Sequence, residues 1–157
     1  MPTVIELAQE LPALAGLSPE HRRATGGCAR NRVFQRGEAL LREGGPADAF
    51  FVLRSGSVAI QTRDPARGAE TVETIHAGEL VGWSWLVPPF RSAFDARALA
   101  TTHVLEFDGA CLRGKCDADP ALGYDLLRLL AVVFTERLQN TRLRLLDLYG
   151  TGHDRLR

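Results

Sequence analysis

The feature that most constrains the fold of this chain is a run of short strand patterns between residues 28 and 108. Glycines punctuate the run, and apolar or alternating segments lie at 49–54, 57–62, 71–75 and 98–107. Ser55-Gly56 predicts a tight turn, and the segment 64–68 predicts a longer hairpin loop. No helical pattern alternates with these strands, which disfavours a doubly wound α/β sheet. The run therefore predicts a double-stranded β-helix, a jelly-roll-like β-roll.

Helical patterns flank this β-roll on both sides. Residues 1–27 carry apolar residues at helical spacing, with a break after which Ser18 is the expected N-cap and Pro19 the first helical residue. Residues 109–150 begin with a short helical piece and continue as a long helix from Pro120, which Gly150 is expected to end. We therefore expect one α+β, mainly β domain over residues 1–157, with the β-roll at 28–108.

The long helix carries an apolar seam with spacings of three and four residues. The seam consists of Leu127, Leu130, Phe134, Leu138, Thr141, Leu145 and Leu148. Such a pattern is typical of one helix packing against another. A helix of ~30 residues spans ~45 Å, which exceeds what one small domain covers. We expect a homodimer through the helix at 120–149, and docking on the chain's own β-roll is the alternative.

Composition narrows the functional classes. The chain has 19 Lys and Arg residues and 19 Asp and Glu residues, so its overall charge predicts no attraction to nucleic acid or to an anionic membrane. No apolar run approaches the length of a membrane span. The first residues also lack the basic leader and the cleavage site of a signal peptide. We expect a soluble, cytoplasmic protein.

No reactive constellation is recognisable. The cysteines are Cys28, Cys111 and Cys116, and their odd number argues against a disulfide framework, so free thiols are expected. A structural zinc ion needs about four ligands, and nothing in the sequence brings Cys28 and His103 to the other two cysteines. No pair of nucleophile and base is visible. We therefore expect neither catalysis nor a bound metal or cofactor.

The segment at 78–93, GELVGWSWLVPPFRSA, has the parts of an anion site. Gly82 lies nine residues before Arg91. Glycine permits close approach of the backbone, and a helical turn at 81–84 would aim free N–H groups at an anion. Arg91 would supply a guanidinium, and Ser92 a hydroxyl and a backbone N–H. The pattern predicts a site for one buried phosphate.

This segment resembles the phosphate-binding cassette of cyclic nucleotide-binding domains. Pieces at 36–44, 50–58 and 78–82 resemble other parts of that family, in the family's order, and the resemblance covers about residues 5–149. It implies a β-roll sensor domain. By this resemblance, Gly82, Ser84, Arg91, Ser92 and Ala93 hold the cyclic phosphate.

Trp83 departs from the family pattern. The family has a Glu at this position, which accepts a hydrogen bond from the ribose 2′-hydroxyl, whereas an indole has no acceptor. Loss of such a bond costs ~1.5–3 kcal/mol. Trp83 is also a ligand-site candidate, because it could stack on a base or fill the pocket. The span from Gly82 to Arg91 is slightly short, and Pro88-Pro89 stiffens it.

The long helix supplies the remaining candidates. Residues 136–142 resemble the adenine-contacting helix of cAMP-receptor members of the family, where Thr141 matches a base-bonding threonine and Arg137 an arginine of the same cluster. The alternatives are a tolerated seam position for Thr141 and a solvated helix face for Arg137. The match at Thr141 favours cAMP over cGMP as the ligand.

The resemblance implies a stand-alone cyclic nucleotide sensor that signals through its C-terminal helix to a protein partner that the sequence does not identify. Transcription factors of the family carry a helix-turn-helix after the long helix, whereas seven residues follow Gly150 here, so direct DNA binding is not expected. The alternative is a degenerate dimeric interaction module, with Trp83 plugging the pocket, or a sensor of a different small ligand.

Overall fold

The computed structural model describes the backbone of residues 1–154 and the side chains of residues 1–149. Its helices are α1 (Val4–Glu10), the 3-10 helix η1 (Pro12–Leu14), α2 (Pro19–Gly26), α3 (Gly109–Ala118) and α4 (Pro120–Asp154). Its strands are β1 (Ala29–Phe34), β2 (Ala39–Leu41), β3 (Ala49–Ser55), β4 (Ser57–Asp64), β5 (Gly68–His76), β6 (Leu80–Val81), β7 (Asp95–Ala98) and β8 (Thr102–Asp108).

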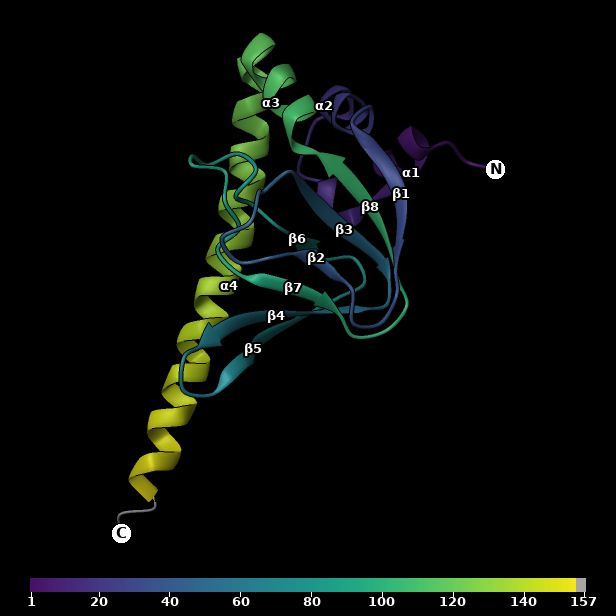
Figure 1. The fold of residues 1–157 in the computed structure, drawn as a ribbon. Helices are drawn as coiled ribbons and strands as arrows, with labels where there is room; N and C mark the ends of the chain where they lie inside the picture. The colour runs from purple at the N-terminus through teal and green to yellow at the C-terminus, as the bar shows by residue number, and fades with distance from the viewer. Residues whose placement is uncertain (155–157) are drawn as a thin grey trace.

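The strands form two antiparallel four-stranded sheets, in the orders β1-β8-β3-β6 and β2-β7-β4-β5. Chain neighbours such as β2 and β3 therefore lie in different sheets. In Figure 1, α1, α2 and α3 lie at the upper end of the β-roll, and α4 runs along its left side. The predicted jelly-roll-like fold with N-terminal helices and a long C-terminal helix is confirmed.

Strand β3 is buried on both faces and divides the core in two. Phe50 and Val52 belong to a cluster shared with the helices, whereas Phe51 and Leu53 belong to a cluster between the two sheets. All four side chains are 0–1% exposed. Because successive side chains of a strand point to opposite faces, a continuous apolar run fits a strand covered on both sides.

The predicted local signals hold in the N-terminal helices. The side chain of Ser18 caps α2 by accepting from the His21 N–H, and Pro19 is the first helical residue. Gly56 forms the predicted turn between β3 and β4 with a φ of 88°. Sequence reasoning did not resolve β1, β2 and β6. It also merged the end of β7 with β8, which residues 99–101 separate.

Helix α4 extends beyond the rest of the molecule. Its inner face, at Leu122, Leu126 and Leu130, is buried in the cluster shared with β3. Residues 138–149 are all exposed, and the distal part of the helix projects from the β-roll (Figure 1). The prediction was therefore wrong for Leu130, which packs in its own domain and does not face outward. Helix α4 also continues through Gly150 to Asp154.

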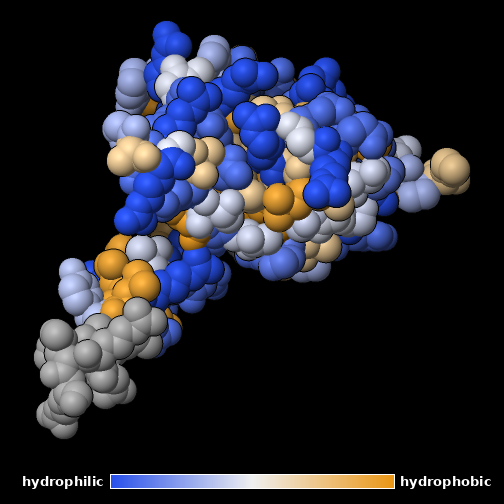
Figure 2. Space-filling model, turned by 60° about the horizontal axis from the view of Figure 1, so that its bottom comes forward, coloured by the Kyte–Doolittle hydropathy of each residue, from blue (hydrophilic) through white to orange (hydrophobic). Residues whose placement is uncertain are grey.

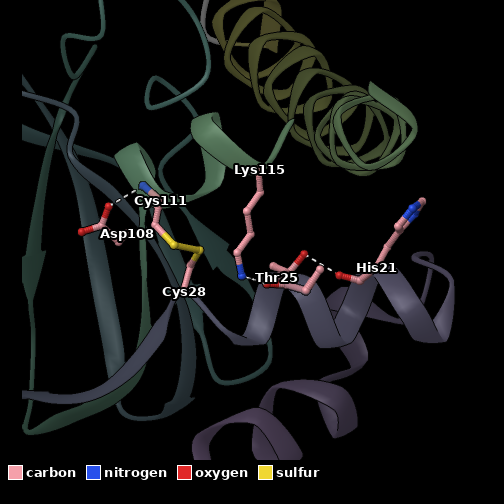
Figure 3. Close-up of a disulfide and its surroundings, with 7 residues drawn as sticks. His21, Thr25, Cys28, Asp108, Cys111 and Lys115 are labelled. Atoms are coloured by element: carbon pink, nitrogen blue, oxygen red, sulfur yellow. Dashed lines mark hydrogen bonds between the residues drawn. A yellow bond between two sulfur atoms is a disulfide. The ribbon is translucent and has the colours of Figure 1, made fainter. Parts of the chain in front are cut away.

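The expectation of three free thiols was wrong. Cys28, between α2 and β1, forms a disulfide with Cys111 in the first turn of α3, and their Cα atoms are 5.8 Å apart (Figure 3). Only Cys116 is free among the described residues. The odd number excluded a complete set of bridges but left one pair open, and the sequence separation of 83 residues hid which pair meets.

No helix in the described part of the chain is both long enough and apolar enough to cross a membrane.

Two glycines with similar positive φ values provide a matched test of the fold. Gly56 and Gly68 have φ values of 88° and 80°. A Cβ on Gly56 would lie 2.7 Å from the Thr101 carbonyl oxygen, whereas one on Gly68 would meet nothing within 4 Å. We expect Gly68→Ala to lose about 1–2 kcal/mol of unfolding free energy from the left-handed conformation alone. Gly56→Ala should lose a further ~1–3 kcal/mol from crowding. Urea unfolding measures both, and equal losses would contradict the packing described at Gly56.

Candidate functional site

Gly82 begins the candidate site immediately after β6. It is buried and has a φ of 92°. A Cβ at this position would lie 3.2 Å from the Ala49 carbonyl oxygen and from Leu41 Cδ1. Both the left-handed backbone and the close approach to β3 therefore require glycine.

The backbone after Gly82 forms turns, and the predicted helical turn at 81–84 is absent from the described structure. Leu80 and Val81 are in β6, and the turns are closed by bonds from Leu86 N to Trp83 O (3.3 Å) and from Val87 N to Ser84 O (3.2 Å). Pro88 and Pro89 have no N–H, so a regular helix cannot continue through them.

The turns after Gly82 nevertheless leave backbone N–H groups without a protein acceptor, as was predicted for a helical turn. Within the described residues, the backbone N–H groups of Trp83, Ser84 and Trp85 have no protein acceptor. Three successive donors without a protein acceptor are a suitable cradle for an anion.

Arg91 lies at the other end of the segment, beside the connection between β2 and β3. It forms an isolated antiparallel bridge with Pro46, and Ser92 exchanges backbone hydrogen bonds with Gly44 and Gly45 at 2.8 and 2.9 Å. Gly82 packs on Leu41 and Ala49, the strand residues on either side of this connection. Both ends of the segment therefore contact the same part of the chain.

The guanidinium of Arg91 is exposed and donates to the Gly44 carbonyl oxygen at 3.3 Å. No carboxylate pairs with it among the described residues. Ser92 differs, since its buried hydroxyl already donates to the Phe94 carbonyl oxygen at 2.7 Å. Ser84 is buried and Ala93 is exposed. Arg91 is thus the cation of this segment that remains available to an external anion.

Trp83 contacts the long helix. Its ring meets Phe134 edge to face, with the centroids 5.3 Å apart. Trp85, by contrast, is fully buried and stacks on Phe50 at 5.4 Å. The Trp83 indole therefore links the segment to α4.

The two helix candidates behave differently. Arg137 is largely buried, donates to the Leu80 carbonyl oxygen and lies 3.9 Å from Glu73. Burial lowers the pKa of its guanidinium, and the nearby Glu73, Glu79 and Glu136 oppose that shift. Arg137 is therefore not on a solvated face. Thr141 is exposed and donates to the Arg137 carbonyl oxygen at 2.9 Å, which fits a tolerated polar position in the seam.

Sequence reasoning missed Arg113. From α3 it donates to the Trp85 carbonyl oxygen at 2.5 Å, and its guanidinium lies 4.5 Å from the centre of the Phe90 ring. In a helix, the Trp85 carbonyl oxygen would accept a hydrogen bond from the N–H of residue 89. Pro89 has no N–H, so Arg113 supplies the donor instead. The prolines in the sequence indicate that a donor from elsewhere in the chain must bond this carbonyl oxygen, but they do not identify that donor.

Asp95, buried at the start of β7, bonds the connection between β2 and β3. Its carboxylate accepts from the Glu43 N–H at 2.7 Å and from Arg63 at 3.4 Å. Burial tends to raise the pKa of this carboxyl, but those donors hold the pKa below its ordinary value. Asp95 is therefore ionised at neutral pH and fixes the backbone just before Gly44.

A cleft of about 560 Å³ lies nearby, between η1, the β5–β6 region and α4. Its charged lining comprises Glu73, Glu79, Asp125, Arg128, Glu136 and Arg137. Four carboxylates against two guanidinium groups make it a poor site for a phosphate. The donors at residues 82–93, by contrast, have no carboxylate paired with them among the described residues.

Comparison with known proteins decides the family. The sequence profile described as "Cyclic nucleotide-binding domain" matches residues 31–119, more than half of the chain. The chain belongs to the cyclic nucleotide-binding domain family. The resemblance seen in the sequence is thereby confirmed, and residues 82–93 are called the cassette below.

The chain spans about half or less of the length of the curated relatives it matches. It is 30% identical, over 75% of the chain, to a CRP-like cAMP-activated global transcriptional regulator of Mycobacterium tuberculosis, of which it spans 51%. It is 40% identical, over 56% of the chain, to glutaminase 1 of Bradyrhizobium diazoefficiens, of which it spans 14%. A crystal structure from Geobacter metallireducens matches with a TM-score of 0.76 and 25% identity, covering 88% of this chain and 99% of that one.

Family and fold are those of regulatory cyclic nucleotide-binding domains. Within the described residues, no group of three or more His, Cys, Asp or Glu side chains is arranged to hold a metal ion.

Proposed function

We propose that this cyclic nucleotide-binding domain binds cAMP at the cassette and passes the binding event to α4. The observation that carries the proposal is the combination of three acceptor-free N–H groups at 83–85 with the unpaired guanidinium of Arg91. A cyclic phosphate carries one negative charge, and burying it requires both a cation and several donors.

The base end of the ligand is assigned to α4 by resemblance. Thr141 is exposed one turn beyond Arg137, so its hydroxyl can exchange its bond to the helix carbonyl for a base. Arg137 already bonds Leu80, two residues before Gly82, and we assign it to the support of the cassette. A threonine matched to adenine recognition places cGMP second to cAMP.

Trp83 gives the cassette a direct contact with the signalling helix. Its ring touches Phe134 on α4, so a change in the turn after Gly82 acts on this packing. A ligand that binds one arrangement of the turn more tightly shifts the position of α4 toward the arrangement that fits it.

The outer face of α4 supports a homodimer. Apart from Leu130, the apolar seam residues are exposed, from 37% at Phe134 to 70% at Leu148. Figure 2 shows apolar surface on the part of the helix that projects from the β-roll. A second copy of α4 would bury this seam, which gives the signal a route between subunits.

The first test concerns the phosphate. Arg91→Ala removes a charged hydrogen-bond partner worth ~1.5–3 kcal/mol, so the affinity for cAMP should fall ~10–100-fold by calorimetry. Arg54→Ala is the matched control, because Arg54 is also exposed but lies at the end of β3, bonded to Asn31. Unchanged affinity in the Arg91 variant would exclude the cassette as the phosphate site. No binding by the wild-type chain at millimolar cAMP or cGMP would favour the non-nucleotide interaction module.

The second test concerns the sugar. Trp83 offers no acceptor to the ribose 2′-hydroxyl. Hence 2′-deoxy-cAMP should bind within about twofold of cAMP, whereas a charged acceptor would make the deoxy ligand ~10–100-fold weaker. Competition calorimetry compares the two. A large penalty for the deoxy ligand would mean that another acceptor replaces the acid missing at residue 83.

The third test concerns assembly. A double variant, Leu138→Asp with Leu145→Asp, places charges on one face of the projecting helix and should convert the dimer to monomer in sedimentation velocity. Leu143→Asp is the control, since Leu143 is 60% exposed, like Leu138 at 54%, but lies about 140° around the helix. A monomeric wild-type chain, or equal effects of the charges on both faces, would argue against the seam as the dimer contact.

A further inference from the structure

The first five residues of α3 are held from two sides. On one side, Cys111 is joined to Cys28 by the disulfide, and on the other, Arg113 reaches the cassette at Trp85 and Phe90 (Figure 3 shows the disulfide side). Residues two apart on a helix are separated by about 200° around its axis. The disulfide and Arg113 therefore act on the start of α3 from opposite faces.

The cassette also packs directly on the first turn of α3. A Cβ on Gly109 would lie 3.0 Å from Trp85 Cβ, and the Gly109 N–H bonds the Asp48 carbonyl oxygen at 2.7 Å. There is consequently little free space between the start of α3 and the middle of the cassette. A displacement of this turn must be felt at Trp85.

Non-covalent contacts accompany the disulfide. The Asp108 N–H donates to the Cys28 carbonyl oxygen at 2.9 Å, and the Asp108 carboxylate caps α3 by accepting from the Cys111 N–H at 2.8 Å. The Lys115 ammonium donates to the Ala24 carbonyl oxygen at the end of α2, at 2.7 Å (Figure 3). None of these contacts involves the S–S bond, so we expect the reduced chain to remain folded with a less restrained first turn of α3.

The disulfide can be reached by a reagent. Cys111 is exposed, Cys28 is 7% exposed, and both line a surface cleft of about 460 Å³. The third cysteine is less suited to exchange, because burial and then the nearby Asp117 and Asp119 raise the pKa of the Cys116 thiol.

The core makes a purely structural need for the disulfide weak. A chain of this size buries enough apolar surface to fold without one. Where a disulfide is not needed for folding and is accessible, a redox role is the better account of it, and in reducing compartments such bridges are commonly redox-sensing.

We propose that Cys28–Cys111 is a thiol–disulfide exchange site, with a dithiol as its reductant, whose oxidation state sets the ligand affinity of the cassette. The affinity part rests on the proposed function. In the oxidised chain the pinned α3 turn keeps Arg113 on the Trp85 carbonyl that Pro89 cannot serve, and this preorganises the cassette. Reduction frees the turn, so the ligand must supply the ordering and binds more weakly.

The exchange is balanced by the reductant. One thiolate of the dithiol attacks the sulfur of the exposed Cys111, and Cys28 leaves as a thiolate that takes up a proton. The second thiolate of the reductant then attacks the reductant's first sulfur, which is bonded to the Cys111 sulfur. Cys111 leaves as a thiolate and takes up a proton. Two electrons and two protons pass to the protein, and the reductant becomes a cyclic disulfide.

The redox part is tested on the full chain with dithiothreitol as the probe, without denaturant. Intact mass after alkylation in denaturant should show one modified cysteine before treatment and three after it. Hydrogen exchange, measured without nucleotide, should then rise at 83–91 and 109–118 in the reduced chain and stay unchanged in the β4–β5 hairpin. Three thiols in the untreated chain, resistance to dithiothreitol until unfolding, or unchanged exchange would each overturn the proposal.

The affinity part uses cAMP calorimetry in a Cys116→Ala background, which removes the third thiol. We expect the reduced chain and the Cys28→Ser variant to bind about threefold or more weakly than the oxidised chain. The Arg113→Ala variant should show no difference between the two redox states, because the turn then no longer acts on Trp85. Equal affinities in the two states of the Cys116→Ala chain, or tighter binding on reduction, would overturn the coupling. No cAMP binding in either state would instead refute the proposed function and leave the hydrogen-exchange result to decide the redox part.

Discussion

The structure depends on the burial of β3 on both faces. One face of the strand packs with the helices, the other packs with the second sheet, and its edges pair with β8 and β6. Pairing with β6 brings Gly82 onto the backbone of Ala49, and Phe50 receives the ring of Trp85. The cassette is therefore positioned by the same apolar run that holds the two cores together.

The charged side chains around the cassette differ in whether they already have partners. The Asp95 carboxylate accepts hydrogen bonds from the Glu43 N–H and from Arg63. The Arg137 guanidinium bonds the Leu80 carbonyl oxygen and pairs with Glu73, so both buried charges already have partners within the fold. Arg91 alone in the cassette keeps a guanidinium without a carboxylate among the described residues. The proposed phosphate would meet this guanidinium, which bonds only the Gly44 carbonyl oxygen in the described part of the chain, at one end of the segment and the acceptor-free N–H groups at the other.

The sequence predicted what depends on local pattern. Period-two strands, the Ser18-Pro19 helix start and the turn at Gly56 all follow from residue type and spacing. It could not predict what depends on distant partners. Leu130 fits the seam by its spacing, but its side chain is buried in the core. Cys28 and Cys111 meet only because α3 returns to the end of α2. Arg113 belongs to the same class, since its role exists only where α3 passes the carbonyl of Trp85.

The measurement that tests the account most directly is a titration of the ¹⁵N-labelled chain with cAMP, followed by amide NMR. If the cassette holds the phosphate, the amide protons of Trp83, Ser84 and Trp85 should move downfield together and saturate at one cAMP per chain. The Arg91 guanidinium signals should shift with the same midpoint. Unchanged cassette amides at saturating cAMP, or shifts confined to the cleft between η1 and α4, would contradict the account.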